Sequence, residues 1–219
     1  MGGNHTSGNV SDPEVPPDYL TLAQSRLSVE QRIELASKPL VQASEADSLS
    51  EDQHMHRFIL QLVVRDAEVR VRQALAETLA DNLDAPHDIV LALANDVDLV
   101  ASPVLSLSDD LTPTDLIAII ENMGASQKML EISGRKNVPA DVCAALIELC
   151  DEANAERLLQ NIGANIPESG VHRLVDRHRD KEEIQKSLIE RSTLPATVIE
   201  RVIALVTSEL LSRLVERHQ

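Results

Sequence analysis

Three side chains near residue 175 have the residue types of a metal site. His172 and Asp176 are four positions apart, so on a helix they share one face and could hold a divalent cation; His178 follows shortly after. Metal centres usually need three or four converging ligands, and three arginines interleaved with these residues would repel a cation. We therefore expect no metal site and no cofactor.

Other reactive pairs give little support for catalysis. His54 and His56 are two positions apart and cannot share a helical face. Asp96 and Asp98 could be imagined as paired carboxylates, but they fall in an expected turn with no pocket implied. The sequence has no glycine-rich phosphate loop, no nucleophile elbow and no cysteine with a convincing histidine partner. We expect no enzymatic activity.

Basic and acidic residues alternate between Arg173 and Arg191. Such a stretch usually forms a solvated helix face with ion pairs between residues four positions apart, each worth only a few tenths of a kcal/mol. The alternative is a ridge that contacts an anion or a partner.

Charge is distributed unevenly along the chain. The formal net charge of the 219 residues is −16, of which residues 1–125 carry −14 and residues 126–219 carry −2. From Gln73 to Gln127 there is no lysine or arginine, although ten acidic residues occur. Capping of helix starts explains some of them, for example Asp84 and Asp115. It does not explain the missing cations, because solvated surfaces usually mix both signs.

We infer an acidic face on the first half of the chain, which should attract a protein partner with a basic segment. The candidate partner-binding residues are six aspartates expected at turns or helix starts. They are Asp84, Asp88, Asp96, Asp98, Asp109 and Asp110.

Five prolines predict the elements that position these residues. Pro86, Pro113, Pro139, Pro167 and Pro195 are separated by 27, 26, 28 and 28 residues. Proline is tolerated at the first position of a helix, and mostly apolar residues follow each proline after three, four and seven positions, which is one helical face. A second short periodic segment follows each of these helices, for example 97–107, 126–133, 154–160, 181–191 and 208–218.

Units this small must stack to bury their apolar stripes, so the pattern predicts an all-α fold, an α-solenoid of helix pairs with a repeat of about 26–28 residues. Glycines at 124, 134 and 163 are expected to end segments in the left-handed conformation. An ordinary helical bundle with coincidental prolines is the alternative.

Residues 1–18 are polar and proline-containing, which indicates a disordered tail. The single solenoid domain is expected over 19–219, with atypical capping helices in 19–81 and regular repeats in 82–219. Ser28 and Gln31 predict a capping box for a helix over 29–42, and residues 43–50 read as a polar loop before a helix capped by Ser50. Asp66 is expected to cap a helix over 67–79.

Cys143 occupies an apolar slot of its repeat, and Cys150 lies seven positions later; both are expected to be buried free thiols. The slot of His178 holds Val97 and Cys150 in sibling units, so this histidine should either be bonded to a neighbour or be locally exposed.

Composition argues against nucleic acids and membranes as partners. Tyr19 and Phe58 are the only Tyr, Phe or Trp residues, so platforms for base stacking are missing, and the negative charge repels phosphate backbones. There is no apolar run of about 18 residues and no apolar core of a signal peptide near the N-terminus. We expect a cytoplasmic protein; the sequence does not indicate its oligomeric state.

Several segments resemble a known family. They are 66–80, Ala85-Pro86, 93–96, 100–105 and 115–120. Together they resemble a bacterial domain-of-unknown-function family, number 2336, of helical repeat proteins, and are similar to leucine-rich repeat variant and HEAT-like repeats. The resemblance covers about Leu27 to the C-terminus, is most specific between Asp66 and Ile120, and implies an α-solenoid without known catalytic residues. The iron–sulfur cluster of some leucine-rich repeat variants is not implied, because it needs more than two cysteines.

These observations favour a non-enzymatic scaffold or adaptor that binds a protein through its acidic surface. The alternative is a regulatory sensor of a small ligand or metal, using the residues around His172 or the aspartate-rich turns. A hydrolase or transferase would need a deep pocket with converging titratable groups.

Overall fold

The computed structural model describes residues 26–37, 51–82, 84–123, 127–179 and 181–191, together with 197, 199, 200 and 203. Side chains at 51–56, 123 and 182 are not included in that description. The expected tail at 1–18, the loop at 43–50, Ser50, Gly124, Pro195, the side chains of His54 and His56, and the segment 208–218 therefore lie outside it.

The described chain is all-helical. Its helices are α2 (Val29–Ala36), α3 (Glu51–Val63), α4 (Val69–Leu79), α5 (His87–Ala94), α6 (Asp98–Leu107), α7 (Pro113–Met123), α8 (Gln127–Ser133), α9 (Ala140–Leu149), α10 (Glu152–Gln160), α11 (Glu168–Arg177) and α12 (Glu182–Glu190). No strand occurs in these residues; Val138 and Ala164 form an isolated parallel bridge. The all-α prediction is confirmed.

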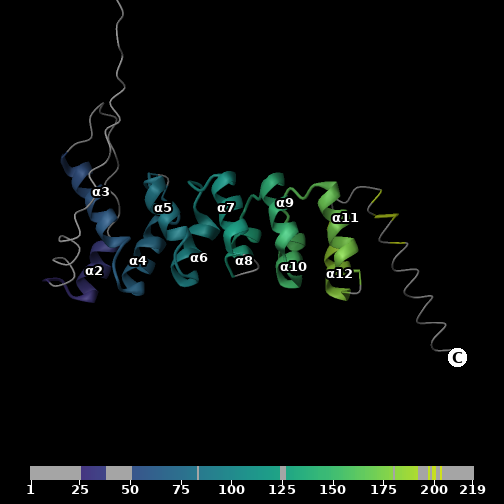
Figure 1. Cartoon of the computed structure of the whole chain (residues 1–219), viewed down its shortest axis with the longest axis horizontal. Helices are drawn as coiled ribbons and strands as arrows, with labels where there is room; N and C mark the ends of the chain where they lie inside the picture. The colour runs from purple at the N-terminus through teal and green to yellow at the C-terminus, as the bar shows by residue number, and fades with distance from the viewer. Residues whose placement is uncertain are drawn as a thin grey trace, which may run out of the picture.

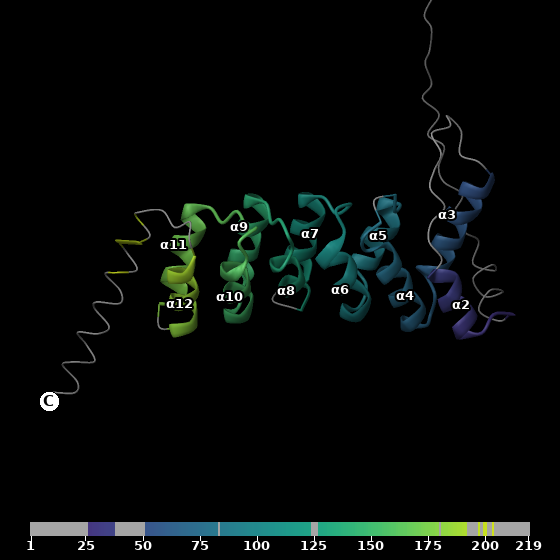
Figure 2. The ribbon, with the colours of Figure 1, turned by 180° about the vertical axis from the view of Figure 1, so that it is seen from behind.

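The helices follow one another in chain order along the long axis of the molecule (Figures 1 and 2). From α4 onward, each even-numbered helix packs against the next even-numbered helix. Among the odd-numbered helices, α7 packs against α9 and α9 against α11. Because the even-numbered helices pack side by side, the turns that follow them also lie next to one another. Residues of the turns after α4, α6 and α8 line one groove, which is described below.

The prolines begin helices as predicted. Pro113 is the first residue of α7, whereas Pro86, Pro139 and Pro167 are the N-caps of α5, α9 and α11 with φ between −66° and −61°. The proline ring fixes φ near this value, so each helix has a preset start. The apolar residues seven positions after these four prolines are all buried: Leu93, Ile120, Leu146 and Leu174.

The N-terminal helices differ in part from the prediction. Ser28 and Gln31 form the expected capping box of α2, but α2 ends at Ala36 and does not extend to residue 42. The helix α4 begins at Val69 with Glu68 as its N-cap, so Asp66 is not its cap. The Asp66 carboxylate instead accepts the Glu68 N–H before the helix starts, at 2.9 Å.

The glycine prediction was wrong for the described positions. Neither Gly134 nor Gly163 has φ in the left-handed region. At Gly163 the requirement is space, because a Cβ there would lie 1.8 Å from the Lys136 carbonyl oxygen. This close approach accompanies the bond from the Val138 N–H to the Gly163 carbonyl, at 3.1 Å.

Long polar side chains join the helix pairs α7–α8, α9–α10 and α11–α12 to the pair that precedes each. We call them the capping side chains: Lys128, Arg135, Asn161, Arg177 and Arg191. Each donates to main-chain carbonyls 26–34 positions earlier, at or just beyond the C-terminus of a helix. Helix C-termini leave carbonyls without intrahelical partners and carry partial negative charge, so these donors stabilise the stack at its weakest hydrogen-bonding positions.

The basic stretch 173–191 is part of this arrangement. Arg173 pairs with Glu148, and Lys181 pairs with Glu152 at 2.7 Å, in both cases across to the preceding helix pair. Neither of these pairs joins residues four positions apart, the spacing that the sequence predicted; a pair with that spacing, His172 with Glu168 at 3.7 Å, lies just outside the stretch. The stretch therefore serves mainly to connect one helix pair to the one before.

Candidate functional site

Three of the six candidate aspartates lie together, in the turns that follow α4 and α6. We call Asp84, Asp109 and Asp110 the acidic cluster. Burial raises the pKa of Asp110; the nearby His87 lowers it, and the negative charges of Asp109 and Asp84 raise it further. The net result is a raised pKa, so the ionised form of Asp110 is disfavoured in the folded protein.

His87 lies beside this cluster at the start of α5. Its Nδ1 is 3.0 Å from the Asp110 carbonyl oxygen, and its Nε2 is 3.5 Å from an Asp115 carboxylate oxygen. Asp115 also accepts the Thr112 N–H at 2.9 Å, at the start of α7, which confirms its predicted capping role. Asp84 has no such role, because Pro86 is the N-cap of α5.

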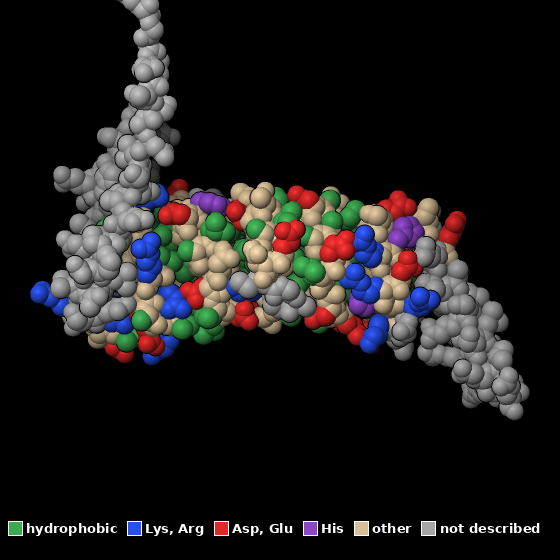
Figure 3. All heavy atoms as spheres, in the orientation of Figure 1, with side chains coloured by type: hydrophobic (Ala, Val, Ile, Leu, Met, Phe, Trp, Pro, Cys, Tyr) green, Lys and Arg blue, Asp and Glu red, His purple; other side chains and the backbone are tan. Residues whose placement is uncertain are grey.

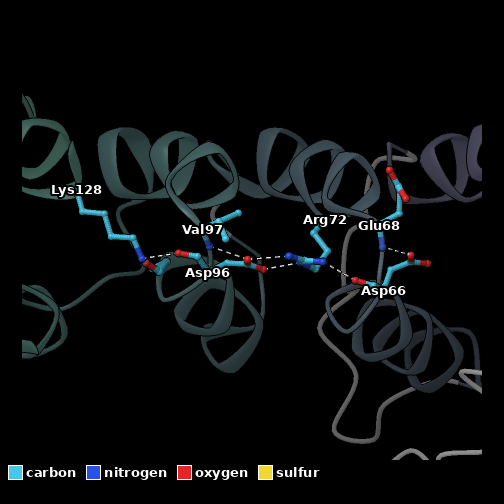
Figure 4. A network of polar contacts seen from close by, with 7 residues as sticks. Asp66, Glu68, Arg72, Asp96, Val97 and Lys128 are labelled. Atoms are coloured by element: carbon cyan, nitrogen blue, oxygen red, sulfur yellow. Dashed lines mark hydrogen bonds and ion pairs between the residues drawn. The ribbon is translucent and has the colours of Figure 1, made fainter. Parts of the chain in front are cut away.

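Asp96 is partly buried and lies in a network of polar contacts (Figure 4). Its carboxylate accepts from Arg72 Nε and Nη2 at 2.5 and 2.9 Å, and from the Val97 N–H at 2.7 Å. Burial alone would raise the pKa of Asp96, but the bonds from Arg72 and Val97 outweigh it and hold the pKa below its ordinary value. Asp96 was a candidate for binding a partner, but its carboxylate already forms an ion pair with Arg72.

The same network links elements far apart in the sequence. Arg72 also donates to the Asp66 carbonyl at 2.6 Å, and Asp66 pairs with Arg32 of α2 at 2.8 Å. Lys128, at the start of α8, donates to the Asp96 carbonyl at 2.5 Å. Arg72 and Lys128 are the cations immediately before and after the cation-free segment 73–127. Both donate hydrogen bonds to Asp96, Arg72 to its carboxylate and Lys128 to its main-chain carbonyl.

The remaining two candidates lie apart from the acidic cluster. Asp88, in the first turn of α5, is 3.5 Å from Arg57 of α3 and is half exposed. Asp98 is exposed at the start of α6, next to the Asp96 network. The structure thus brings together three of the six aspartates.

Cations are scarce over the middle of the face shown in Figure 3. On this face, blue side chains gather near α4 and around α11 and α12, while acidic and apolar side chains occupy the surface between them (Figure 3).

Beside the acidic cluster is a groove that the sequence analysis missed. Its volume is about 470 Å³. We call it the charged groove; its lining residues come from the turn after α4, from α6, α8 and α10, and from the turns after α6 and α8. They are Asp81, Ser106, Leu107, Asp109, Glu131, Gly134, Arg135, Lys136, Asn137 and Arg157.

Two carboxylates and two cations of this groove have no ion pair among the described residues. They are Asp81 and Asp109 toward α4 and α6, and Lys136 and Arg157 toward α8 and α10. Arg135 is different: it is buried, and its guanidinium donates to the Leu105 and Ser108 carbonyls, each at 2.7 Å.

Glu131 and Gly134 position Arg157 in the groove. Burial would raise the pKa of Glu131, but its bond from the Ser106 hydroxyl, at 2.7 Å, a bond from Gln127 and attraction to Arg157 together lower it. A Cβ at Gly134 would lie 2.7 Å from Arg157 Nη2, so the guanidinium rests on the bare backbone of this glycine. The sequence analysis missed this contact because Gly134 and Arg157 are 23 positions apart and belong to no common motif.

The histidine and cysteine predictions can be compared directly with the structure. His172 lies near Glu168, and no group of three or more metal-ligating side chains occurs in the described residues. His178 is buried, and its Nε2 has no hydrogen-bond partner among the described residues. The structure therefore shows neither the exposed side chain nor, at Nε2, the bond to a neighbour that the sequence predicted. Cys143 and Cys150 are free and buried as predicted, and burial raises the pKa of Cys143 to about 12.

A family model described as "uncharacterised protein conserved in bacteria (DUF2336)" matches residues 100–219, more than half of the chain. The chain belongs to this family. The match includes Asp109, Asp110 and all of the charged groove except Asp81; of the resemblance over residues 66–120, it includes only the final part. No curated protein and no solved structure matches the chain. None of the helices in the described residues combines the length and the apolar character needed to cross a bilayer.

Proposed function

We propose that the helix pairs form an α-solenoid that acts as a non-enzymatic scaffold and binds a protein with a basic segment through the acidic cluster. The observation that carries this proposal is that Asp110 is half-buried and lies near enough to Asp109 and Asp84 for their charges to raise its pKa. Stacked helix pairs offer extended surfaces that suit protein ligands.

The cluster disfavours its own folded state. Like charges held near one another repel, and burial of Asp110 adds a desolvation penalty. A bound cation would relieve the repulsion, so this energy favours binding of a basic segment. Arg135 is near enough for its charge to interact with that of Asp109, but its hydrogen bonds go to main-chain carbonyls, which leaves the carboxylates of the cluster without a direct bond from this guanidinium.

The test is capture of proteins from lysate of the source bacterium, at low and at moderate salt. The variant Asp84→Asn/Asp109→Asn/Asp110→Asn removes the cluster. A matched control, Asp98→Asn/Glu183→Gln/Glu190→Gln, changes the net charge equally at exposed positions elsewhere.

We expect one partner that the parent and the control retain and the cluster variant loses. Retention should fall as salt rises, since exposed charges are screened beyond about 10 Å at 0.1 M ionic strength. Equal loss in the cluster variant and the control would show that total charge, not this cluster, attracts the partner, and undiminished retention by both would exclude the cluster as the binding site.

A further inference from the structure

The charged groove is lined by opposite charges that come from different elements. Asp81 and Asp109 form an acid pole, on the turns after α4 and α6. Lys136 and Arg157 form a basic pole, on the turn after α8 and on α10. With Glu131 and Arg135 included, the formal charges of the lining residues balance. The groove therefore does not suit a simple anion or a simple cation.

We propose that the charged groove binds an extended peptide segment that carries a basic side chain and, a few residues away, a carboxylate. The basic side chain pairs with Asp81 and Asp109, and the carboxylate pairs with Lys136 and Arg157. This inference rests on the proposed function: the segment belongs to the same protein partner, and Asp109 belongs to both the groove and the acidic cluster.

The separation of the poles determines the ligand. Packed neighbouring helices lie about 8–10 Å apart, and α6 packs against α8, so the nearest members of the two poles, Asp109 after α6 and Lys136 after α8, are separated by about one such spacing. A free amino acid cannot span this gap, since its ammonium and carboxylate groups are joined through a single carbon. An extended chain rises about 3.3 Å per residue, so side chains about three positions apart reach both poles.

The size of the groove agrees with a short segment. Pockets of about 300–1,000 Å³ bury ligands of drug size, and this groove has about 470 Å³. Leu107, an exposed apolar side chain in the lining, offers contact to the aliphatic stem of a bound lysine or arginine.

Gly134 holds one pole in place. Because a Cβ at this position would collide with the Arg157 guanidinium, Gly134→Ala must displace that guanidinium without any change in charge. The groove should therefore lose affinity in this variant nearly as it does when Arg157 is replaced.

The test uses the full chain, labelled with ¹⁵N, and three capped alanine-based probe peptides of about seven residues. One probe carries Arg and Glu about three positions apart. The second carries only the Arg and the third only the Glu. Titrations followed by amide chemical shifts give both the affinity and the binding place.

We expect the Arg–Glu peptide to shift the amides of residues 106–109 and 134–137. Removal of either charge from the peptide should weaken binding up to about fivefold, as expected for one exposed ion pair. In Lys136→Gln/Arg157→Gln, removal of the peptide Glu should have no further effect. In Asp81→Asn, removal of the peptide Arg should matter less than in the parent chain. The control Asp98→Asn should behave like the parent.

Two results would overturn the inference. One is binding of the Arg-only peptide as tightly as the Arg–Glu peptide; the other is the absence of shifts in residues 106–109 and 134–137. Binding of the Arg–Glu peptide that depends on Asp84 and Asp110, but not on Lys136 and Arg157, would remove the groove and leave the proposed function standing. Loss of the partner in Asp84→Asn/Asp110→Asn, with peptide binding intact, would support both.

Discussion

Replacement of Arg135 by methionine should weaken the fold strongly, although the change removes a charge and adds an apolar side chain. Arg135 follows α8, and its guanidinium donates to the Leu105 and Ser108 carbonyls at the end of α6, each at 2.7 Å. The residue is only 7% exposed, so water has little access to replace these bonds. Arg135→Met therefore leaves two carbonyls without these donors.

The magnitude follows from the two carbonyls and one opposing effect. A buried polar group that loses its partner costs about 1–3 kcal/mol, so two such groups cost several kcal/mol at most. The opposing effect is desolvation: burial lowers the pKa of Arg135, which shows that the charged guanidinium is itself disfavoured in this site. We expect a net loss of about 2–4 kcal/mol in the free energy of unfolding.

Urea unfolding followed by far-UV circular dichroism measures this loss. The chain has no tryptophan, so fluorescence is a poor probe. The control is Lys136→Met, an exposed neighbour with the same change of charge, which should stay within about 0.5 kcal/mol of the parent. If both variants unfold at the same urea concentration, then Arg135 does not stabilise the end of α6 and the role assigned to the capping side chains is wrong.

Three further predictions concern single positions. Asp110→Asn should raise the thermal midpoint at pH 7, because the raised pKa means that the folded state disfavours the ionised form; the gain should vanish once the pH falls below about 4, where the parent carboxyl is protonated. Burial lowers the pKa of His178, so the parent should lose stability as the pH falls below about 6.5, while His178→Leu, compared by thermal midpoints at pH 8 and 5, should lose less. Gly163→Ala should cost more than about 2 kcal/mol in urea unfolding, because its Cβ meets the Lys136 carbonyl; Gly134→Ala, whose Cβ meets a flexible side chain, should cost less than about 1 kcal/mol, and equal losses would contradict this steric argument.

Local sequence patterns predicted the helices because their causes are local. Proline fixes φ wherever it stands, so Pro86 and Pro113 gave helix starts correct to within a residue. The capping box of Ser28 and Gln31 involves residues three positions apart. Asp66 failed as a predicted cap because a distant residue, Arg32, pairs with its carboxylate.

The candidate site was predicted less well, because its geometry depends on contacts between successive helix pairs. Sequence counts treated Asp96 and Asp109 alike, yet Arg72 binds the Asp96 carboxylate and no described cation binds that of Asp109. The charged groove depends on Gly134 and Arg157, which belong to successive helix pairs. A period of 26–28 residues predicts which elements stack, but not which side chains meet across the stack.

The position of the cations affects which carboxylates of the acidic half have a direct ion pair. Lys128 and Arg135 lie at the end of the acidic half, where they could have neutralised the aspartates nearby. Their donors instead go to main-chain carbonyls at the ends of α5 and α6. A carbonyl carries only a partial charge, so Arg135 satisfies a helix end while the Asp109 carboxylate has no direct ion pair among the described residues. The charge of the acidic cluster is thus linked to how the helix pairs are held together. A variant that released the Arg135 guanidinium toward Asp109 should weaken both the packing of the helix pairs and the affinity for a basic segment.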